Sequence, residues 1–93
     1  MKKFELGEVV MTRGIANYLE SELFDTQQLS ECVKRHESGD WGDLCDEDKR
    51  MNDYAIKYGD RILSAYTVGE DIKIWIITEC DRSYTTILLP EEY

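Results

Sequence analysis

Cysteine is scarce in this chain, and the spacing of its few copies excludes two common uses. The cysteines are odd in number and have no C-x-x-C spacing: Cys32, Cys45 and Cys80. Disulfide frameworks need paired cysteines, and zinc knuckles need closely spaced ones. We therefore expect reduced thiols in a cytoplasmic protein.

Long apolar runs are also missing. No window approaches the roughly 20 apolar residues that a membrane-spanning helix needs. Residues 1–3, Met-Lys-Lys, resemble the basic start of a secretory signal peptide, but Glu5, Gly7 and Glu8 interrupt the apolar segment that should follow. The sequence thus predicts neither a membrane protein nor a secreted one, which agrees with a cytoplasmic location.

Basic residues are few, with 11 Lys and Arg against 20 Asp and Glu and a formal net charge of −9 at pH 7. Affinity for nucleic-acid phosphates and anionic lipids comes from Lys and Arg, so we expect no direct binding to nucleic acid or membrane. A protein partner with a basic surface fits this charge better. The composition, 42% hydrophobic and 33% charged, is typical of a globular protein, and we expect one domain over residues 1–93.

The strongest strand signal lies at residues 71–78, Asp-Ile-Lys-Ile-Trp-Ile-Ile-Thr, which hold four isoleucines and a tryptophan. Strand-like segments lie on both sides, at 61–68 and 83–89, and the connections between them are short and carry turn residues. An antiparallel meander is the simplest arrangement of these three strands. Residues 4–11 predict a further strand, which we expect to join the same sheet.

Three helices are predicted between the first strand and the meander. The first has apolar residues at the spacing of one helical face: Ile15, Tyr18, Leu19 and Leu23. The second begins at Asp25 or Thr26, ends at 38–39, and has a similar face: Leu29, Cys32, Val33 and His36. The third is capped by Asp46, ends before Gly59, and is expected to bury one face: Met51, Tyr54, Ala55 and Tyr58. The order β-α-α-α-β-β-β predicts an α+β fold, with helices packed against an antiparallel sheet.

The clearest chemical candidate is the lone histidine, His36, which precedes Asp40 and Asp43 by a few residues. A histidine oriented by a carboxylate can act as a general base, and these three residues are the weak catalytic candidates. His36 also continues the apolar face of its helix and lies in the last turn, where a cation complements the helix dipole, so a structural role is favoured. The sequence has no recognisable nucleophilic triad and no phosphate-binding glycine loop, and we expect no cofactor.

Acidic residues cluster between residues 37 and 53. A calcium loop of the EF-hand kind fails in register, because Trp41 and Gly42 fall where ligands should be, and no metal site is expected. Trp41 is predicted to pack on the domain and to hold the loop 39–43 rigid; an exposed Trp41 would instead centre a binding surface. An acidic face for a basic partner is expected to include Glu37, Asp40, Trp41, Asp43, Asp46, Glu47 and Asp48.

Three stretches resemble a known family. The first two are His-x-Ser-Gly-Asp-Trp-Gly-Asp-Leu at 36–44 and Arg-Ile-Leu-Ser-x-Tyr at 61–66. The third covers 73–90 and consists of Lys-Ile-Trp-Ile-Ile-Thr-Glu-x-Asp-Arg-Ser, one further residue, and Thr-Thr-Ile-Leu-Leu-Pro. With them, residues 4–93 resemble a family of small bacterial proteins borne on plasmids and conjugative elements. The resemblance implies a mobile-element origin and carries no assigned activity. The element order alone is also similar to that of RelE-type ribonuclease toxins. Those toxins are basic because they handle RNA, which argues against RNA cleavage by this acidic chain.

Three functional hypotheses are consistent with these observations. The favoured one is an accessory protein of a mobile element that binds another protein, in its narrower form an inhibitor that presents a nucleic-acid-like acidic surface to a host defence nuclease. The alternative is a small hydrolase or nuclease-like enzyme with a site at 39–43, where His36 is the base and Asp40 or Asp43 orients it or binds a metal. The third is a structural subunit or homodimer that pairs through an exposed sheet edge.

Overall fold

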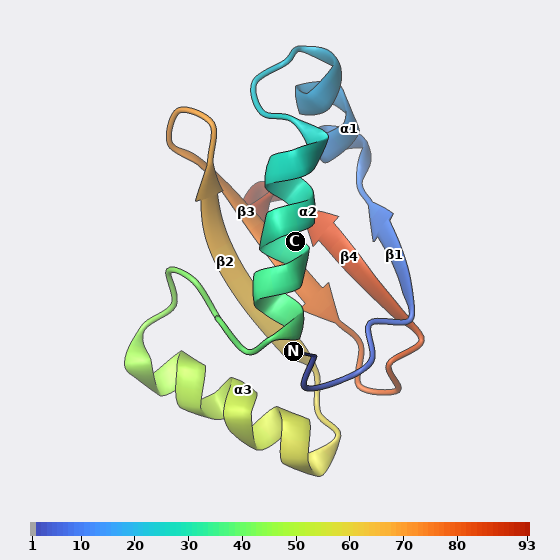
Figure 1. The fold of residues 1–93 in the computed structure, drawn as a ribbon, viewed down its shortest axis with the longest axis vertical. Coiled ribbons are helices and arrows are strands. Elements are labelled where there is room, and N and C mark those ends of the chain that lie inside the picture. Colours follow the sequence, from blue (N-terminus) through green and yellow to red (C-terminus); the bar gives the residue numbers. More distant parts are fainter. Residues whose placement is uncertain (1) are drawn as a thin grey trace.

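The computed structural model describes residues 2–93 and has an α+β fold (Figure 1). Within these residues the helices are α1 (Arg13–Glu20), α2 (Thr26–Glu37) and α3 (Asp46–Tyr58). The strands are β1 (Glu8–Met11), β2 (Ile62–Val68), β3 (Ile72–Thr78) and β4 (Tyr84–Leu88), and a 3₁₀ turn, η1 (Pro90–Glu92), follows β4. The predicted fold class and element order are confirmed.

The sheet has the strand order β1-β4-β3-β2. Its last three strands form the predicted antiparallel meander, in which Ile76 of β3 pairs with Ser64 of β2 and Ile87 of β4. β1 instead runs parallel to β4, with Val10 opposite Thr86, so the sheet is mixed rather than wholly antiparallel. β1 and β2 therefore run in the same direction. A parallel pair needs a long connection, and the three helices together with β2 and β3 lie between β1 and β4 in the chain.

The main core lies between α2 and one face of the sheet (Figure 1). α2 begins with a capping box, in which the Asp25 carboxylate accepts from the Gln28 N–H and the Gln28 side chain accepts from the Asp25 N–H. The helix ends before Ser38, as predicted. The residues buried in this core are Ile15, Phe24, Leu29, Cys32, Tyr66, Val68, Ile74, Ile76, Ile87 and Leu89.

α3 lies beside β2, at the edge of the sheet (Figure 1). Asn52 Nδ2 donates to the Leu63 carbonyl oxygen at 2.6 Å, and Asn52 Oδ1 accepts from the Leu63 N–H at 3.2 Å, so the carboxamide takes the place of a neighbouring strand. Ala55 is the buried apolar residue of this face. The expected buried face is wrong at three positions, which are largely exposed: Met51 (64%), Tyr54 (58%) and Tyr58 (57%). A sheet edge presents backbone donors and acceptors, so a polar and a small residue face it.

The strand predicted over residues 4–11 is shorter in the structure, because residues 4–7 are not extended along the sheet. Phe4 is buried and its ring stacks on that of Trp41, with 6.1 Å between the ring centroids. Gly7 has a φ of +66° and passes so close to the carbonyl groups of Arg82 and Ser83 that a Cβ would overlap them. Residues 4–7 therefore pack as an irregular segment, and only the last four residues of the predicted strand pair with β4.

Candidate functional site

His36, the catalytic candidate, lies in the interior of the protein. Its side chain is 0% exposed, with Nδ1 2.5 Å from Ser64 Oγ and Nε2 2.8 Å from Thr78 Oγ1. The rings of Phe4 and Trp41 pack against the imidazole in edge-on geometry. Burial lowers the pKa of His36 to about 3, because the charged ring would lose its hydration, so the ring is neutral near neutral pH. A general base must reach a substrate, and this ring is enclosed.

The hydrogen-bond network assigns the tautomer of His36. Thr85 donates its hydroxyl hydrogen to the Leu6 carbonyl oxygen at 2.7 Å, and Thr78 Oγ1 lies 2.7 Å from Thr85 Oγ1. Each hydroxyl has one hydrogen, so Thr78 donates to Thr85, and His36 Nε2–H donates to Thr78. Nδ1 is then the acceptor, and Ser64 donates to it. These bonds connect α2, three strands and the segment before β1, which makes the histidine a structural residue.

The two aspartates of the proposed catalytic site lie on the surface and pair with basic residues. Asp40 Oδ2 accepts from Arg35 Nε at 2.7 Å, and this bond holds the pKa of Asp40 below its usual value. Asp43 Oδ2 lies 3.7 Å from Lys73 Nζ. Within residues 2–93 neither carboxylate hydrogen-bonds to His36. The structure does not bring the three catalytic candidates together.

Trp41 holds the acidic loop against the edge of β2. Its side chain is 4% exposed, and its Nε1–H donates to Asp53 Oδ1 at 3.0 Å. Its carbonyl oxygen accepts from the Ala65 N–H at 3.3 Å, and the Asp43 N–H donates to the Ala65 carbonyl oxygen at 2.7 Å. The prediction that Trp41 packs on the domain is confirmed. The same burial leaves little of the Trp41 side chain accessible to a partner.

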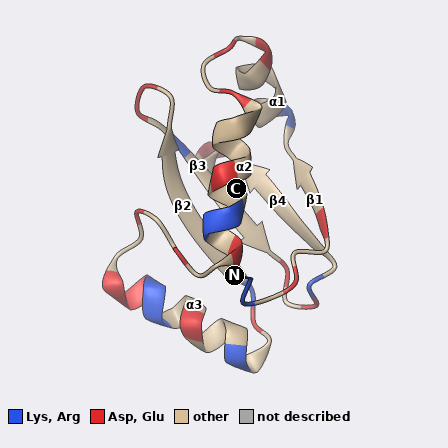
Figure 2. Ribbon diagram, in the orientation of Figure 1, with Lys and Arg blue, Asp and Glu red and all other residues tan. Residues whose placement is uncertain are grey.

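The other acidic residues of the expected binding face lie on the two helices that flank this loop. Glu37 is half-buried at the end of α2. Three exposed carboxylates occupy the first turn of α3, at the positive end of its dipole: Asp46, Glu47 and Asp48. Figure 2 shows this acidic N-terminal end of α3. None of these four side chains takes part in the ion pairs found among residues 2–93. The acidic residues of the expected face therefore fall into two groups. Those in the loop pair with basic side chains, and those on the helices do not in the described part of the chain.

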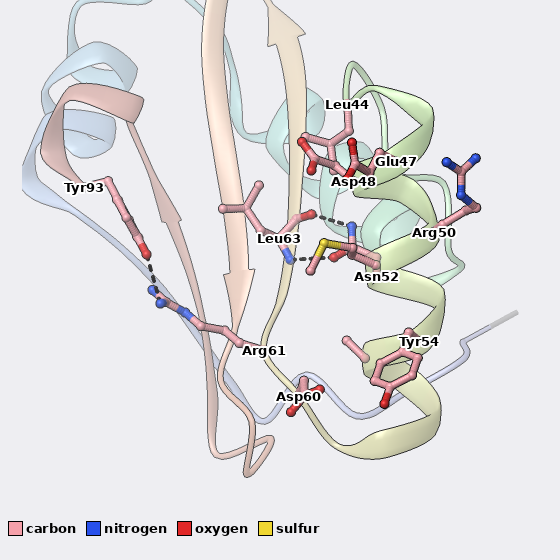
Figure 3. Close-up of a pocket in the computed structure, with 12 residues that line it drawn as sticks. Leu44, Glu47, Asp48, Arg50, Asn52, Tyr54, Asp60, Arg61, Leu63 and Tyr93 are labelled. Carbon is pink, nitrogen blue, oxygen red and sulfur yellow. Dashed lines mark hydrogen bonds between the residues drawn. The ribbon is translucent and has the colours of Figure 1, made fainter.

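The outer face of α3 exposes large apolar side chains beside a hollow. The rings of Tyr54 and Tyr58 lie 4.2 Å apart between centroids, and Met51 is exposed one turn before them. Met51 and Tyr54 also line a hollow of about 860 Å³ between α3 and β2, to which Leu63 and Tyr93 contribute (Figure 3). Charged residues of both signs also line the hollow: Glu47, Asp48, Arg50, Asp60 and Arg61. We call the exposed residues Met51, Tyr54 and Tyr58 together with this hollow the α3 surface.

Sequence spacing alone does not reveal the α3 surface. Met51, Tyr54 and Tyr58 recur at helical spacing, which is the same for a buried face and for an exposed one. The sequence does indicate which face of α3 is buried, because Asn52 and Ala55 lie on one side of the helix and are suited to contact a sheet edge. Reading that signal requires knowing that α3 lies beside β2, which is a tertiary relation.

Comparisons with protein-family models, with curated proteins and with solved structures found no match. In the part of the chain that the structure describes, no cluster of three or more His, Cys, Asp or Glu side chains is arranged to hold a metal ion. None of the helices within residues 2–93 combines the length and apolar character needed to cross a bilayer. The function must therefore be inferred from the surface of the molecule.

Proposed function

We propose that this protein is a small accessory protein that binds a protein partner through the α3 surface. The observation that carries the proposal is the exposure of Met51, Tyr54 and Tyr58, each more than half accessible, on one helix face beside a hollow of about 860 Å³. Tyrosine and methionine are enriched in protein interfaces, where they bury large areas and tyrosine loses little side-chain entropy. A concave wall next to an aromatic face is the shape that receives anchor residues from a partner.

The charge around the α3 surface supports a basic partner. The acidic first turn of α3 adjoins the exposed aromatic residues, and the chain has a net charge of −9. Complementary charge accelerates association with a basic surface and disfavours acidic competitors, and the effect weakens as salt rises. In its narrower form the proposal names the partner as a host defence nuclease whose phosphate-binding groove receives these carboxylates. The resemblance of residues 36–44 and 73–90 to plasmid-borne proteins supports the mobile-element setting of this form.

The test begins with capture and then measures affinity. Immobilised protein is used to capture a partner from host lysate, the partner is identified and purified, and the dissociation constant is measured by calorimetry. The double substitution Tyr54→Ser with Tyr58→Ser should weaken binding at least about tenfold, because interface tyrosines often contribute more than 1 kcal/mol each. The control is Tyr84→Ser, which removes a tyrosine that is 43% exposed on β4. Equal affinities for the α3 variant and the wild-type protein would refute the proposed surface.

A second pair of variants separates local charge from total charge. Glu47→Gln with Asp48→Asn removes two carboxylates from the α3 surface, and Glu70→Gln with Asp71→Asn removes two from the β2–β3 turn. Both double variants change the net charge equally. We expect the first pair alone to slow association and to reduce its salt dependence. If the control pair has the same effect, the local acidic turn does not select the partner, and the proposal of a specific acidic contact fails.

A further inference from the structure

The two edges of the sheet differ in whether their outward-facing backbone groups are hydrogen-bonded. On the β2 edge, the Asn52 carboxamide bonds to both backbone groups of Leu63, and residues 41–43 bond to both backbone groups of Ala65. These bonds occupy the outward-facing backbone groups of Leu63 and Ala65 and so hinder strand pairing along this part of β2. The opposite edge is β1, and among residues 2–93 no element lies beyond it (Figure 1).

The backbone of β1 presents unpaired groups along this open edge. The Glu8 N–H donates to the Ser83 carbonyl oxygen at 3.1 Å, and the Thr12 N–H donates to the Ile87 carbonyl oxygen at 3.0 Å, so these alternate positions face β4. The backbone groups of Val9 and Met11 must then point away from the sheet. Among residues 2–93, no group outside β1 and β4 hydrogen-bonds to them.

The side chains of the same strand are exposed and apolar. Val9, Val10 and Met11 are 44%, 38% and 44% exposed, and no charged residue interrupts them. Lysines, prolines, bulges and very short strands all discourage pairing at sheet edges. β1 is short, at four residues, but Val9, Val10 and Met11 include no lysine, proline or bulge. An uninterrupted apolar edge with unpaired backbone groups is suited to accept another strand.

We propose that β1 pairs antiparallel with β1 of a second copy of this chain, so that two four-stranded sheets become one continuous sheet across a two-fold axis. The outward-facing residues determine the register: Val9 of each copy exchanges both backbone hydrogen bonds with Met11 of the other, and the axis passes between the two Val10 residues. A two-fold axis at Val9 would place Met11 opposite Gly7, whose φ of +66° is not extended. An axis at Met11 would place Val9 opposite Arg13, the first residue of α1.

The proposed pairing is self-complementary in side chains as well as in backbone. Val10 meets Val10 on one face of the joined sheet, and Val9 meets Met11 on the other. Glu8 of each copy lies opposite Thr12 of the other, whose hydroxyl donates to the Glu92 carboxylate. The apolar residues 9–11 offer nothing for a basic partner to recognise, which favours a second copy over the partner proposed for the α3 surface.

The salt dependence of association distinguishes this dimer from a complex formed at the α3 surface. Each copy has a net charge of −9, so two copies repel each other, and screening should strengthen their association. Binding of a basic partner at the α3 surface should weaken under the same change. The two proposals can therefore fail separately.

Sedimentation equilibrium tests the dimer in solution. The wild-type protein, measured from micromolar to millimolar concentration at low and high salt, should dimerise with concentration and more tightly at high salt. Val10→Lys places two like charges directly opposite each other at the axis and should leave a folded monomer, which circular dichroism verifies. A wild-type protein that stays monomeric throughout this range, or a Val10→Lys protein that dimerises equally well, would overturn the proposal.

Cross-linking tests the register. In a background with Cys45→Ser and Cys80→Ser, which removes the exposed thiols, Val10→Cys should form a disulfide-linked dimer under mild oxidation. The facing Cα atoms of such a non-hydrogen-bonded pair are about 4.5 Å apart, within reach of a disulfide. The matched control is Glu8→Cys, because the two Glu8 positions would lie about 14 Å apart along the strands. Equal cross-linking of the two variants, or faster cross-linking of Glu8→Cys, would contradict the register.

Discussion

The buried histidine makes a quantitative prediction about acid stability. The pKa of His36 is about 3 in the folded protein, against 6.5 as its ordinary value. Between these values the unfolded chain binds a proton that the folded protein does not. The folded pKa is the lower one, so the stability is fully present above pH 6.5 and is lost as the pH falls below it. The loss approaches about 1.4 kcal/mol for each pH unit.

Between pH 7 and pH 5, the difference in His36 pKa between the folded and unfolded states lowers the free energy of unfolding by about 2 kcal/mol. This loss is a substantial part of the roughly 5–15 kcal/mol typical of a domain. The carboxylates contribute in a lower range. The pKa of Asp40 is held down by Arg35 and that of Glu92 by the Thr12 hydroxyl, so their stabilisation is lost only as the pH falls through the carboxyl range. The interval from pH 7 to pH 5 therefore isolates the histidine.

Urea denaturation at a series of pH values measures the effect directly. The matched variant is His36→Gln, whose amide can donate to Thr78 and accept from Ser64 without titrating. The variant can lower stability at every pH, so the quantity compared is the slope between pH 7 and pH 5. We expect a falling free energy in the wild-type protein and a flat one in the variant.

NMR of the imidazole provides a second measurement that needs no variant. The chain has one histidine, so its ring signals are unambiguous, and they should not titrate between pH 7 and pH 5. The nitrogen shifts should show a proton on Nε2, as the bonds to Thr78 and Ser64 require. A ring that titrates near 6.5, or a wild-type stability that is flat over this interval, would refute the reasoning.

Two further predictions concern the loop that closes the β2 edge. Trp41→Ala should lower the unfolding free energy by about 3–5 kcal/mol in urea denaturation, while Tyr84→Ala should change it little; comparable losses would mean that Trp41 is not a core residue. Gly42→Ala should cost several times more than Gly59→Ala in thermal melts. Both glycines have positive φ, but only at Gly42 would the added Cβ overlap a neighbour, the Ala65 carbonyl oxygen, whereas Gly59 has nothing within 4 Å; equal melting temperatures would contradict this close approach.

Much of the local structure was predictable from short segments of sequence. The cap at Asp25, the end of α2 before Ser38 and the end of α3 before Gly59 depend on residues within one or two turns of each other. The three C-terminal strands were also predictable, because short turns join β-branched segments whose nearest partners are their neighbours in sequence. The burial of His36 followed from its place on the apolar face of α2.

The candidate site was less predictable, because its composition depends on which elements meet. The hydrogen-bond partners of His36 are Ser64 and Thr78, which lie 28 and 42 positions further along the chain. No local sequence pattern identifies them as its partners. Asp40 and Asp43 were expected to be available to a partner, but folding brings Arg35 and Lys73 beside them. Charge spacing along a chain does not determine which charges become neighbours after folding.

The sequence by itself determined the α+β class, the order of the elements and the C-terminal ends of α2 and α3, since periodicity and capping act over a few residues. The predicted cap at Asp46 was wrong, because Cys45 is the N-cap and Asp46 is the first residue of α3. Only the tertiary structure decided the direction of β1 and the exposed face of α3. Helical spacing requires that one face be covered but does not specify its neighbour, and α3 lies against a sheet edge whose backbone groups select Asn52 and Ala55. The same arrangement leaves Tyr54 and Tyr58 in solvent and β1 without a second partner strand, and both proposed interfaces depend on it.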